Sequence, residues 1–214
     1  MVELEPGLPG RIGELRAALA GRDPWLLAAR SAAVYTALEQ GKGHFDLALW
    51  GRKVHVSYPD FAVLDESEQP LDVLSTALLL YYFDRSDGAP LAGRWIAFGD
   101  LPDGRFYAQA FQGYTGNALA GVFGDDLDGF SRTAQSLGGE AVQLGEAAFA
   151  YRVLPNLSVL AVCWLGDEDF PTRYQVLFDA SAANHLTTDG CAIVGSSLTR
   201  RLIKTYRLGD FWAK

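Results

Sequence analysis

The sequence predicts an α+β fold, with a mainly antiparallel sheet, helices at both termini and one buried central helix. Apolar residues recur at helical spacing over residues 8–21 and again over residues 189–207, close to the two ends. Short segments of strand-forming residues, separated by Gly, Pro, Asn and Asp, fill much of the middle. The regular strand–helix–strand alternation of a doubly wound parallel sheet is absent.

The first forty residues predict two helices. The apolar positions of the first helix are Leu8, Ile12, Leu15 and Leu19. Gly21 then marks a stop, and Asp23-Pro24 supplies an N-cap with proline at the first helical position. The apolar stripe that follows predicts a second helix to about Gln40. We therefore expect residues 1–40 to form an N-terminal helical segment.

The next part of the chain changes its period. Segments 45–50 and 53–58 alternate apolar and polar residues around Gly51-Arg52, which predicts a β-hairpin. Residues 71–84 predict a helix that is apolar on all sides, and such a helix is buried.

The second half predicts further strands and helices. They are a short strand at 62–64, a strand at 94–98, a helical region at 105–123, a helix capped by Asp125-Asp126, and strands at 140–144, 147–154, 157–164 and 174–178. No repeat or low-complexity linker interrupts this order. We expect one domain over residues 1–214, with an α+β core over 45–207, because this length suits one ordinary domain.

The charge and the cysteines bear on location and partners. The formal net charge is −8, which does not suit nucleic-acid binding, because that binding depends on Lys and Arg contacts with phosphates. Cys163 and Cys191 are the two cysteines, too few for a disulfide framework, so we expect a cytoplasmic protein. The longest apolar run, Leu71 to Phe83, is shorter than the ~20 residues that a membrane-spanning helix needs.

An acidic loop follows the apolar strand segment 160–165. Asp167, Glu168 and Asp169 stand in succession there. Mg²⁺ and Ca²⁺ prefer carboxylate oxygens, so the loop is a candidate divalent-cation site, and Asp179 after the next strand is a candidate further ligand. Adjacent carboxylates also suit general acid–base chemistry. A solvated turn is the simpler explanation in so acidic a chain.

Single residues add further candidates. Of the histidines His44, His55 and His185, none stands four positions from another, which excludes an HExxH metal helix. His55 and His185 are candidate bases or ligands if folding brings them to the carboxylates. Cys191, near the start of the last predicted helix, is the candidate reactive thiol, whereas Cys163 is expected in the core.

Two surfaces are candidates for binding. Aromatic residues that would line a cleft for a small ligand, or fill the core, are Trp95, Tyr107, Phe111 and Trp164. Arg200, Lys204 and Arg207 fall on one face of the last helix. This basic face either complements the helix dipole or docks an acidic protein partner. Serine-nucleophile, phosphate-loop and dinucleotide-binding motifs are absent from the sequence.

Several segments occur together and in one order between Tyr58 and Tyr206. They are Leu79–Phe83, Gly93–Phe98, Leu101–Tyr107, Leu137–Gly139, Val153–Pro155, Gly166–Pro171 and Leu177–Asp179. In this order they resemble the family called domain of unknown function thirty-seven eighty-six. The resemblance implies a source among anaerobic prokaryotes, where some members are fused to cysteine-rich iron–sulfur modules of the kind seen in corrinoid proteins. These 214 residues hold no such module, so the resemblance implies an accessory role and assigns no catalytic residue.

The function that we expect is a non-catalytic small-ligand-binding or accessory module, linked to anaerobic corrinoid or iron–sulfur metabolism. One alternative is a divalent-metal-dependent enzyme that uses the Asp167-Glu168-Asp169 loop. The other is a protein-interaction domain that uses the C-terminal basic helix. The expected partner is a small molecule or a protein, not a nucleic acid or a membrane. No cofactor is assigned beyond the divalent cation that the enzyme alternative requires.

Overall fold

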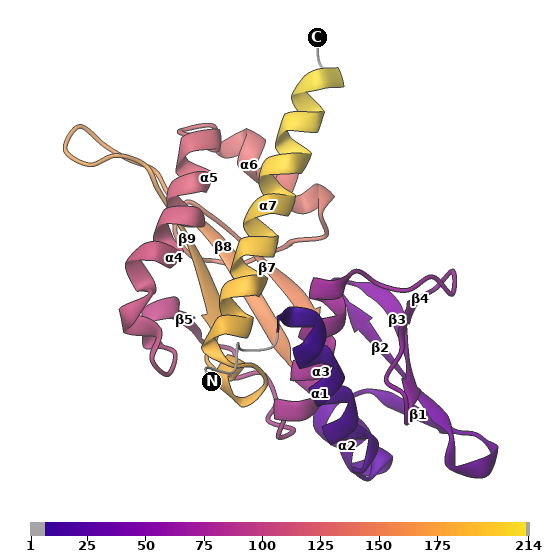
Figure 1. Ribbon diagram of the computed structural model, residues 1–214. Coiled ribbons are helices and arrows are strands. Elements are labelled where there is room, and N and C mark those ends of the chain that lie inside the picture. The colour runs from indigo at the N-terminus through magenta and orange to yellow at the C-terminus, as the bar shows by residue number, and fades with distance from the viewer. Residues whose placement is uncertain (1–6, 213–214) are drawn as a thin grey trace. The chain divides into compact units, whose positions relative to one another are not determined.

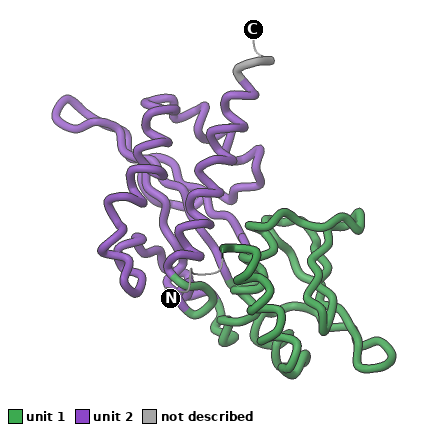
Figure 2. The backbone as a smooth tube through the Cα atoms, in the orientation of Figure 1, with its two compact units in different colours: residues 1–90, 154–156, 184–187 green, residues 91–153, 157–183, 188–214 purple. Residues whose placement is uncertain are grey.

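Two β-sheets and the helices packed on them form the α+β fold that the sequence predicts (Figure 1). The computed structural model describes residues 7–212. The chain divides into two units (Figure 2). Unit 1 comprises residues 1–90, 154–156 and 184–187, and unit 2 comprises residues 91–153, 157–183 and 188–214.

Unit 1 contains a four-stranded sheet in the order β1-β2-β3-β4. Its elements are α1 (Leu8–Ala20), α2 (Pro24–Ser31), β1 (Val34–Ala37), the 3-10 turn Glu39–Gly41, β2 (Gly43–Leu49), β3 (Arg52–Tyr58), β4 (Val63–Asp65) and α3 (Val73–Arg85). The predicted hairpin is confirmed. Trp50 and Gly51 both have positive φ, as a two-residue hairpin turn with the strand twist requires.

The core of unit 1 forms around α3, which packs against α1. Leu79, Leu80 and Phe83 on α3 are almost fully buried, as the all-apolar pattern predicts. The ring of Phe83 lies 4.9 Å from that of Phe45 on β2 and 5.9 Å from that of Phe61 (centroid distances). Alternate residues of β2 point into this core, which leaves the residues between them on the outer face of the sheet.

The second N-terminal helix is shorter than predicted, so a helical segment over residues 1–40 is wrong. Helix α2 ends at Ser31, and Ala32 takes a left-handed conformation with φ 51° and ψ 33°. The chain then continues as β1, where β-branched Val34 and Thr36 suit a strand. Tyr35 packs 5.0 Å from the ring of Phe45, because β1 pairs with β2. Pairing with β2 therefore makes residues 34–37 a strand, although their apolar side chains continue a helical spacing.

Unit 2 contains a five-stranded sheet in the order β5-β9-β8-β7-β6. Its elements are β5 (Trp95–Ala97), 3-10 turns at Phe98–Asp100, Gly104–Phe106 and Ala182–Asn184, α4 (Ala108–Tyr114), α5 (Gly116–Phe123), α6 (Leu127–Ser136), β6 (Glu140–Ala141), β7 (Ala147–Leu154), β8 (Leu157–Trp164), β9 (Arg173–Asp179) and α7 (Thr188–Trp212). Although α7 is long, no helix among residues 7–212 has the length and apolar content that a membrane crossing needs.

The sheet of unit 2 has two unlike faces. Helices α4, α5 and α7 lie over one face (Figure 1). Phe178 and Tyr174 of β9 point toward this side, where Phe178 contacts Phe111 of α4 and Tyr174 contacts Phe123 of α5. The alternate residues form a second apolar cluster on the other face. Its members include Ala148, Leu160, Val162 and Leu177, with Trp95 and Trp164 packed against them.

The start of α5 closes the edge of β9. The carbonyl oxygen of Tyr174 accepts a hydrogen bond of 2.9 Å from Nε2 of Gln112. A side chain at Gly116 would collide with the same carbonyl, so only glycine allows the helix to lie this close. This approach holds Asn117 and Ala120 of α5 beside the first residues of β9.

A single domain over the whole chain stays a prediction. Segments 154–156 and 184–187 belong to unit 1, although the residues on either side of them belong to unit 2. Neither unit is therefore one continuous stretch of sequence, and we expect the two units to unfold in one cooperative transition.

Two tryptophan variants test this expectation. Trp25 and Trp50 lie in unit 1, and Trp95, Trp164 and Trp212 lie in unit 2. Replacing either group by Phe leaves fluorescence that reports on one unit alone. In each variant the urea midpoint from fluorescence should equal the midpoint from far-UV circular dichroism. Two separated transitions would contradict the prediction.

The left-handed residue that ends α2 gives a second prediction. Ala32→Gly should raise the free energy of unfolding by about 0.5–1 kcal/mol, because a left-handed conformation strains a residue with a Cβ and does not strain glycine. Ala29→Gly, inside the same helix, should lower it by about the same amount. Urea denaturation measures both. A loss of stability in Ala32→Gly equal to that in Ala29→Gly would show that residue 32 is helical.

Candidate functional site

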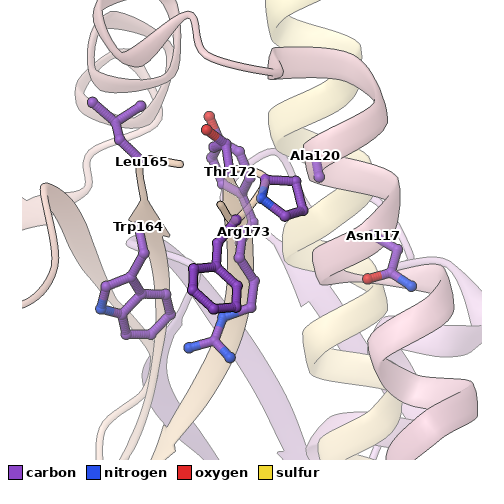
Figure 3. A pocket seen from close by; sticks show the side chains of 9 residues that line it. Asn117, Ala120, Trp164, Leu165, Thr172 and Arg173 are labelled. Carbon is purple, nitrogen blue, oxygen red and sulfur yellow. The ribbon is translucent and has the colours of Figure 1, made fainter. Parts of the chain in front are cut away.

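A pocket of about 580 Å³ lies in unit 2, where the acidic loop joins the ends of β8 and β9 (Figure 3). Its lining residues are Asn117, Ala120, Trp164, Leu165, Phe170, Pro171, Thr172, Arg173 and Tyr174. Most of this lining is apolar or aromatic. Arg173 is the single charged residue in it.

The pairing of β8 with β9 builds one wall of the pocket. Trp164, the last residue of β8, is the register partner of Arg173, the first residue of β9. Partners in an antiparallel ladder project from the same face. The guanidinium carbon of Arg173 lies 4.9 Å from the centre of the Trp164 ring, a cation–π contact worth about 0.5–1 kcal/mol at an exposed position. Arg173 makes no ion pair with any described residue, so its positive charge is available to a ligand.

The acidic loop forms the rim through a defined turn. Oδ1 of Asp167 accepts hydrogen bonds of 2.9 Å from the backbone N–H groups of Asp169 and Phe170. The N–H of Asp167 donates to the carbonyl oxygen of Phe170, at 2.9 Å. Asp167 is thus the residue that closes the turn. Phe170 is held at the pocket with 72% of its surface exposed.

Thr172 ties this rim to the helical layer. Its hydroxyl oxygen accepts a hydrogen bond of 2.8 Å from the N–H of Gly166, and the hydroxyl donates to Oδ1 of Asp125, beside the start of α6. A side chain at Gly166 would collide with the carbonyl oxygen of Phe170. The conformation of the loop is therefore fixed at both of its ends.

Two polar side chains line the pocket beside Arg173 and Thr172: Tyr174 on the inner wall and Asn117 on the far side. Tyr174 is buried, and its hydroxyl donates to the carbonyl oxygen of Gly124 at 3.1 Å. Burial raises the pKa of this phenol far above its ordinary value, so it stays a neutral donor. Across the pocket from Trp164, Asn117 projects from α5 (Figure 3), and its Oδ1 accepts a hydrogen bond of 3.1 Å from Gln112.

The structure does not bring Asp179 to the acidic loop. Asp179 ends β9 and Arg173 begins it, a separation of ~20 Å along the strand. The Asp179 carboxylate is buried, and it accepts hydrogen bonds of 2.8 Å from the N–H groups of Ala92 and Gly93 and of 2.6 Å from the Ser181 hydroxyl. Its role is to hold the chain before β5 against the end of β9.

His55 instead meets residues that the sequence analysis did not connect. It pairs across the hairpin with Asp46, and Nδ1 of His55 lies 2.5 Å from Oδ1 of Asp46. Nε2 of His44 lies 3.6 Å from Oδ2 of the same carboxylate, and Lys53 lies 3.9 Å from Oδ1. Oδ1 of Asp46 is buried, and its short contact with His55 does not have hydrogen-bond geometry. With a two-residue turn at Trp50-Gly51, Asp46 falls opposite His55, so the position of this turn was the sequence signal for the cluster.

His185 is a structural residue of unit 1. It is fully buried, with Nε2 3.0 Å from the carbonyl oxygen of Ala89 and Nδ1 3.0 Å from the hydroxyl oxygen of Ser86. A carbonyl only accepts, so Nε2 carries the proton and Nδ1 accepts from Ser86. The neighbouring Asn184 donates to Asp87 at 2.6 Å. Both ring nitrogens of His185 therefore anchor the segment after α3.

The remaining candidates are in different places. Among the aromatic candidates, Trp164 lines the pocket, whereas Trp95 packs against the same apolar cluster without lining the pocket. Phe111 is buried in a stack with Phe98, and Tyr107 is 63% exposed. Cys163 and Cys191 are free and buried. Burial raises the pKa of Cys191 to about 12, which disfavours the thiolate that a reactive cysteine needs.

The described residues of unit 2 place no cluster of metal ligands at the acidic loop. Across the described part of the chain, no group of three or more His, Cys, Asp or Glu side chains is arranged to hold a metal ion. Whether His55 or His185 approaches the carboxylates of the loop stays a prediction, because the histidines belong to unit 1 and the loop belongs to unit 2.

The buried Asp179 gives a prediction for stability. Asp179→Asn should lower the free energy of unfolding by about 1–3 kcal/mol, because the amide cannot accept all four hydrogen bonds. Asp169→Asn, an exposed change of the same kind, should leave it within about 0.5 kcal/mol. Urea denaturation at neutral pH measures both. Equal effects would contradict a structural role for Asp179.

The contribution of Asp179 to the free energy of unfolding should depend on pH, because its hydrogen bonds shift the pKa of the carboxyl group. Burial raises the pKa of Asp179, but the hydrogen bonds from Ser181, Ala92 and Gly93 outweigh it and hold the pKa below its ordinary value. A depressed pKa stabilises the fold above the unfolded value of about 3.9, and this contribution is lost as the pH falls through the folded pKa. The stability difference between the native protein and Asp179→Asn should therefore shrink at acid pH.

Comparison with known protein families matches residues 23–201 to the family described as "Domain of unknown function (DUF3786)". The match begins well before Tyr58 and so includes the hairpin of unit 1 as well as most of unit 2. It also takes in the whole pocket lining. Searches of curated proteins and of solved structures found no match. Because the family match covers most of its length, the chain belongs to the family Domain of unknown function (DUF3786).

Proposed function

We propose that the protein is a non-catalytic binding module, and that its pocket takes a small, flat, largely apolar ligand with one anionic group. The observation that carries this proposal is the guanidinium of Arg173, which forms no ion pair with a described residue and stacks on Trp164 in the wall of an otherwise uncharged pocket. A volume of about 580 Å³ suits a small molecule.

Arg173 selects for the anionic group of the ligand. A guanidinium donates a planar pair of hydrogen bonds that matches a carboxylate or phosphate. Stacking on Trp164 limits its motion, so less side-chain entropy is lost when a ligand binds. The faces of Trp164 and Phe170 offer flat apolar surfaces to a ring system.

The same lining supports binding without turnover. General acid–base or nucleophilic catalysis needs a titratable or nucleophilic side chain in reach of the ligand. The lining includes no His, Cys, Asp, Glu, Lys or Ser. Its two hydroxyl groups already donate elsewhere, from Thr172 to Asp125 and from Tyr174 to Gly124.

The charge of the rim limits the charge of the ligand. Glu168 and Asp169 lie on the loop that carries Phe170, and both are exposed. Their carboxylates repel a second negative group at the mouth of the pocket. A ligand with a single anionic group therefore suits the site better than a polyphosphate.

The cellular setting is part of the same proposal. Two free, buried cysteines support a cytoplasmic location, where thiols stay reduced. An accessory role in anaerobic corrinoid or iron–sulfur metabolism rests on the family resemblance alone.

A model ligand tests the proposal. We expect 2-naphthoate, a flat ring system with one carboxylate, to bind in a saturable one-to-one manner, and Arg173→Leu to weaken this binding about tenfold or more, as loss of a charged hydrogen bond does. Isothermal titration calorimetry measures both affinities. Arg105→Leu removes an exposed arginine of the same unit that does not line the pocket, and it should leave the affinity unchanged.

The neutral isostere 2-naphthamide separates charge from shape. It should bind more weakly than 2-naphthoate to the native protein, and equally to the native protein and Arg173→Leu. Equal affinities of 2-naphthoate and 2-naphthamide for the native protein would overturn the proposal that Arg173 binds the anionic group. Thermal melting of both variants checks that they are folded.

A further inference from the structure

Helix α7 carries a basic groove that the pocket does not use. Arg200, Ile203, Lys204, Arg207 and Leu208 line a shallow depression of about 510 Å³ on one face of the helix. The three cations stand at positions i, i+4 and i+7, which share a helix face. Leu208 is 52% exposed and Ile203 is half-buried, so the groove combines positive charge with apolar surface.

Nothing within the described chain neutralises this groove. Arg200 makes a 3.4 Å contact with Ser197, and none of the three cations forms an ion pair with a described residue. The helix dipole does not account for the charge, because it acts over the last turn of α7, which holds no basic residue.

The rest of the helix is firmly held. Leu198 and Leu202 are buried on the opposite side of α7, and the Tyr206 hydroxyl donates a hydrogen bond of 2.7 Å to Asp126, the N-cap of α6. The groove is therefore a fixed surface on a rigid element.

A surface of complementary character lies at the tip of the acidic loop. Asp167, Glu168 and Asp169 are all exposed there, next to the exposed ring of Phe170. The connection between β8 and β9 extends outward beyond α4 and α5, so its tip is sterically free in unit 2 (Figure 1). Three carboxylates and one aromatic ring on this tip match three cations and two aliphatic side chains in the groove.

We propose that the groove on α7 binds the acidic loop of a second copy of this chain. Arg200, Lys204 and Arg207 pair with the carboxylates, and the Phe170 ring packs against Ile203 and Leu208. The contact joins two different surfaces, so each copy donates a loop and offers a groove. Such head-to-tail contacts build rings when the rotation closes and filaments when it does not.

The strength of this self-association should depend on the salt concentration. Each copy carries a net charge of −8, which opposes encounter at low ionic strength. Salt at about 0.1 M screens that repulsion beyond ~10 Å and leaves the close pairs in place. Association should therefore pass through a maximum at moderate salt and weaken at high salt.

Charge reversal provides the test, by sedimentation velocity from micromolar to millimolar protein. The average mass of the native protein should rise with concentration. The loop variant Glu168→Lys/Asp169→Lys and the groove variant Arg200→Glu/Lys204→Glu should each stay monomeric. An equimolar mixture of the two variants should associate again, because every loop then has a groove of opposite charge. The four-fold variant should also self-associate.

A charge reversal away from both surfaces serves as the control. Glu66→Lys/Glu68→Lys makes the same charge change at exposed positions of unit 1 and should self-associate like the native protein. A native protein that stays monomeric at millimolar concentration, or a variant mixture that stays monomeric, overturns the proposal. So does assembly of either single-surface variant alone. Arg200 and Lys204 lie outside both the pocket and its acidic rim, so 2-naphthoate binding by the groove variant remains a separate measurement.

Discussion

The antiparallel pairing of β8 with β9 positions one wall of the pocket and the acidic loop at its rim. Cys163 opposite Tyr174 faces the helices, and Trp164 opposite Arg173 faces the other way. A shift of this register by one residue would exchange the two faces. The acidic loop that joins the strands is fixed by Asp167 and Thr172, so the pocket wall and the loop tip are both consequences of one hairpin.

The order of the elements was largely predictable, because local signals agree with tertiary structure over most of the chain. The hairpin around Gly51, the buried helix α3 and the long final helix follow from period, turn residues and composition. The helix expected to Gln40 failed for a tertiary reason. Residues 34–37 pair with β2 and pack on its aromatic side chains, and no pattern local to them indicates this partner.

The candidate site was predictable only in part. The sequence singled out Trp164 and the acidic loop, because an aromatic residue and clustered carboxylates are visible in isolation. It missed Arg173 and Asn117, whose roles depend on strand register and on the approach of α5 at Gly116. Asp179 and His185 were plausible ligands by residue type, but both are buried, and hydrogen bonds occupy the Asp179 carboxylate and both ring nitrogens of His185. Contact partners across the fold, not residue types, decide these roles.

Arg173 and Trp164 together form the surface on which the proposed ligand binding depends. The most direct measurement is a crystal structure of the protein soaked with 2-naphthoate. We expect the carboxylate within hydrogen-bond distance of the Arg173 guanidinium and the ring system against Trp164 and Phe170. A ligand bound elsewhere with this pocket unchanged would contradict it, as would a ligand in the pocket whose carboxylate points away from Arg173.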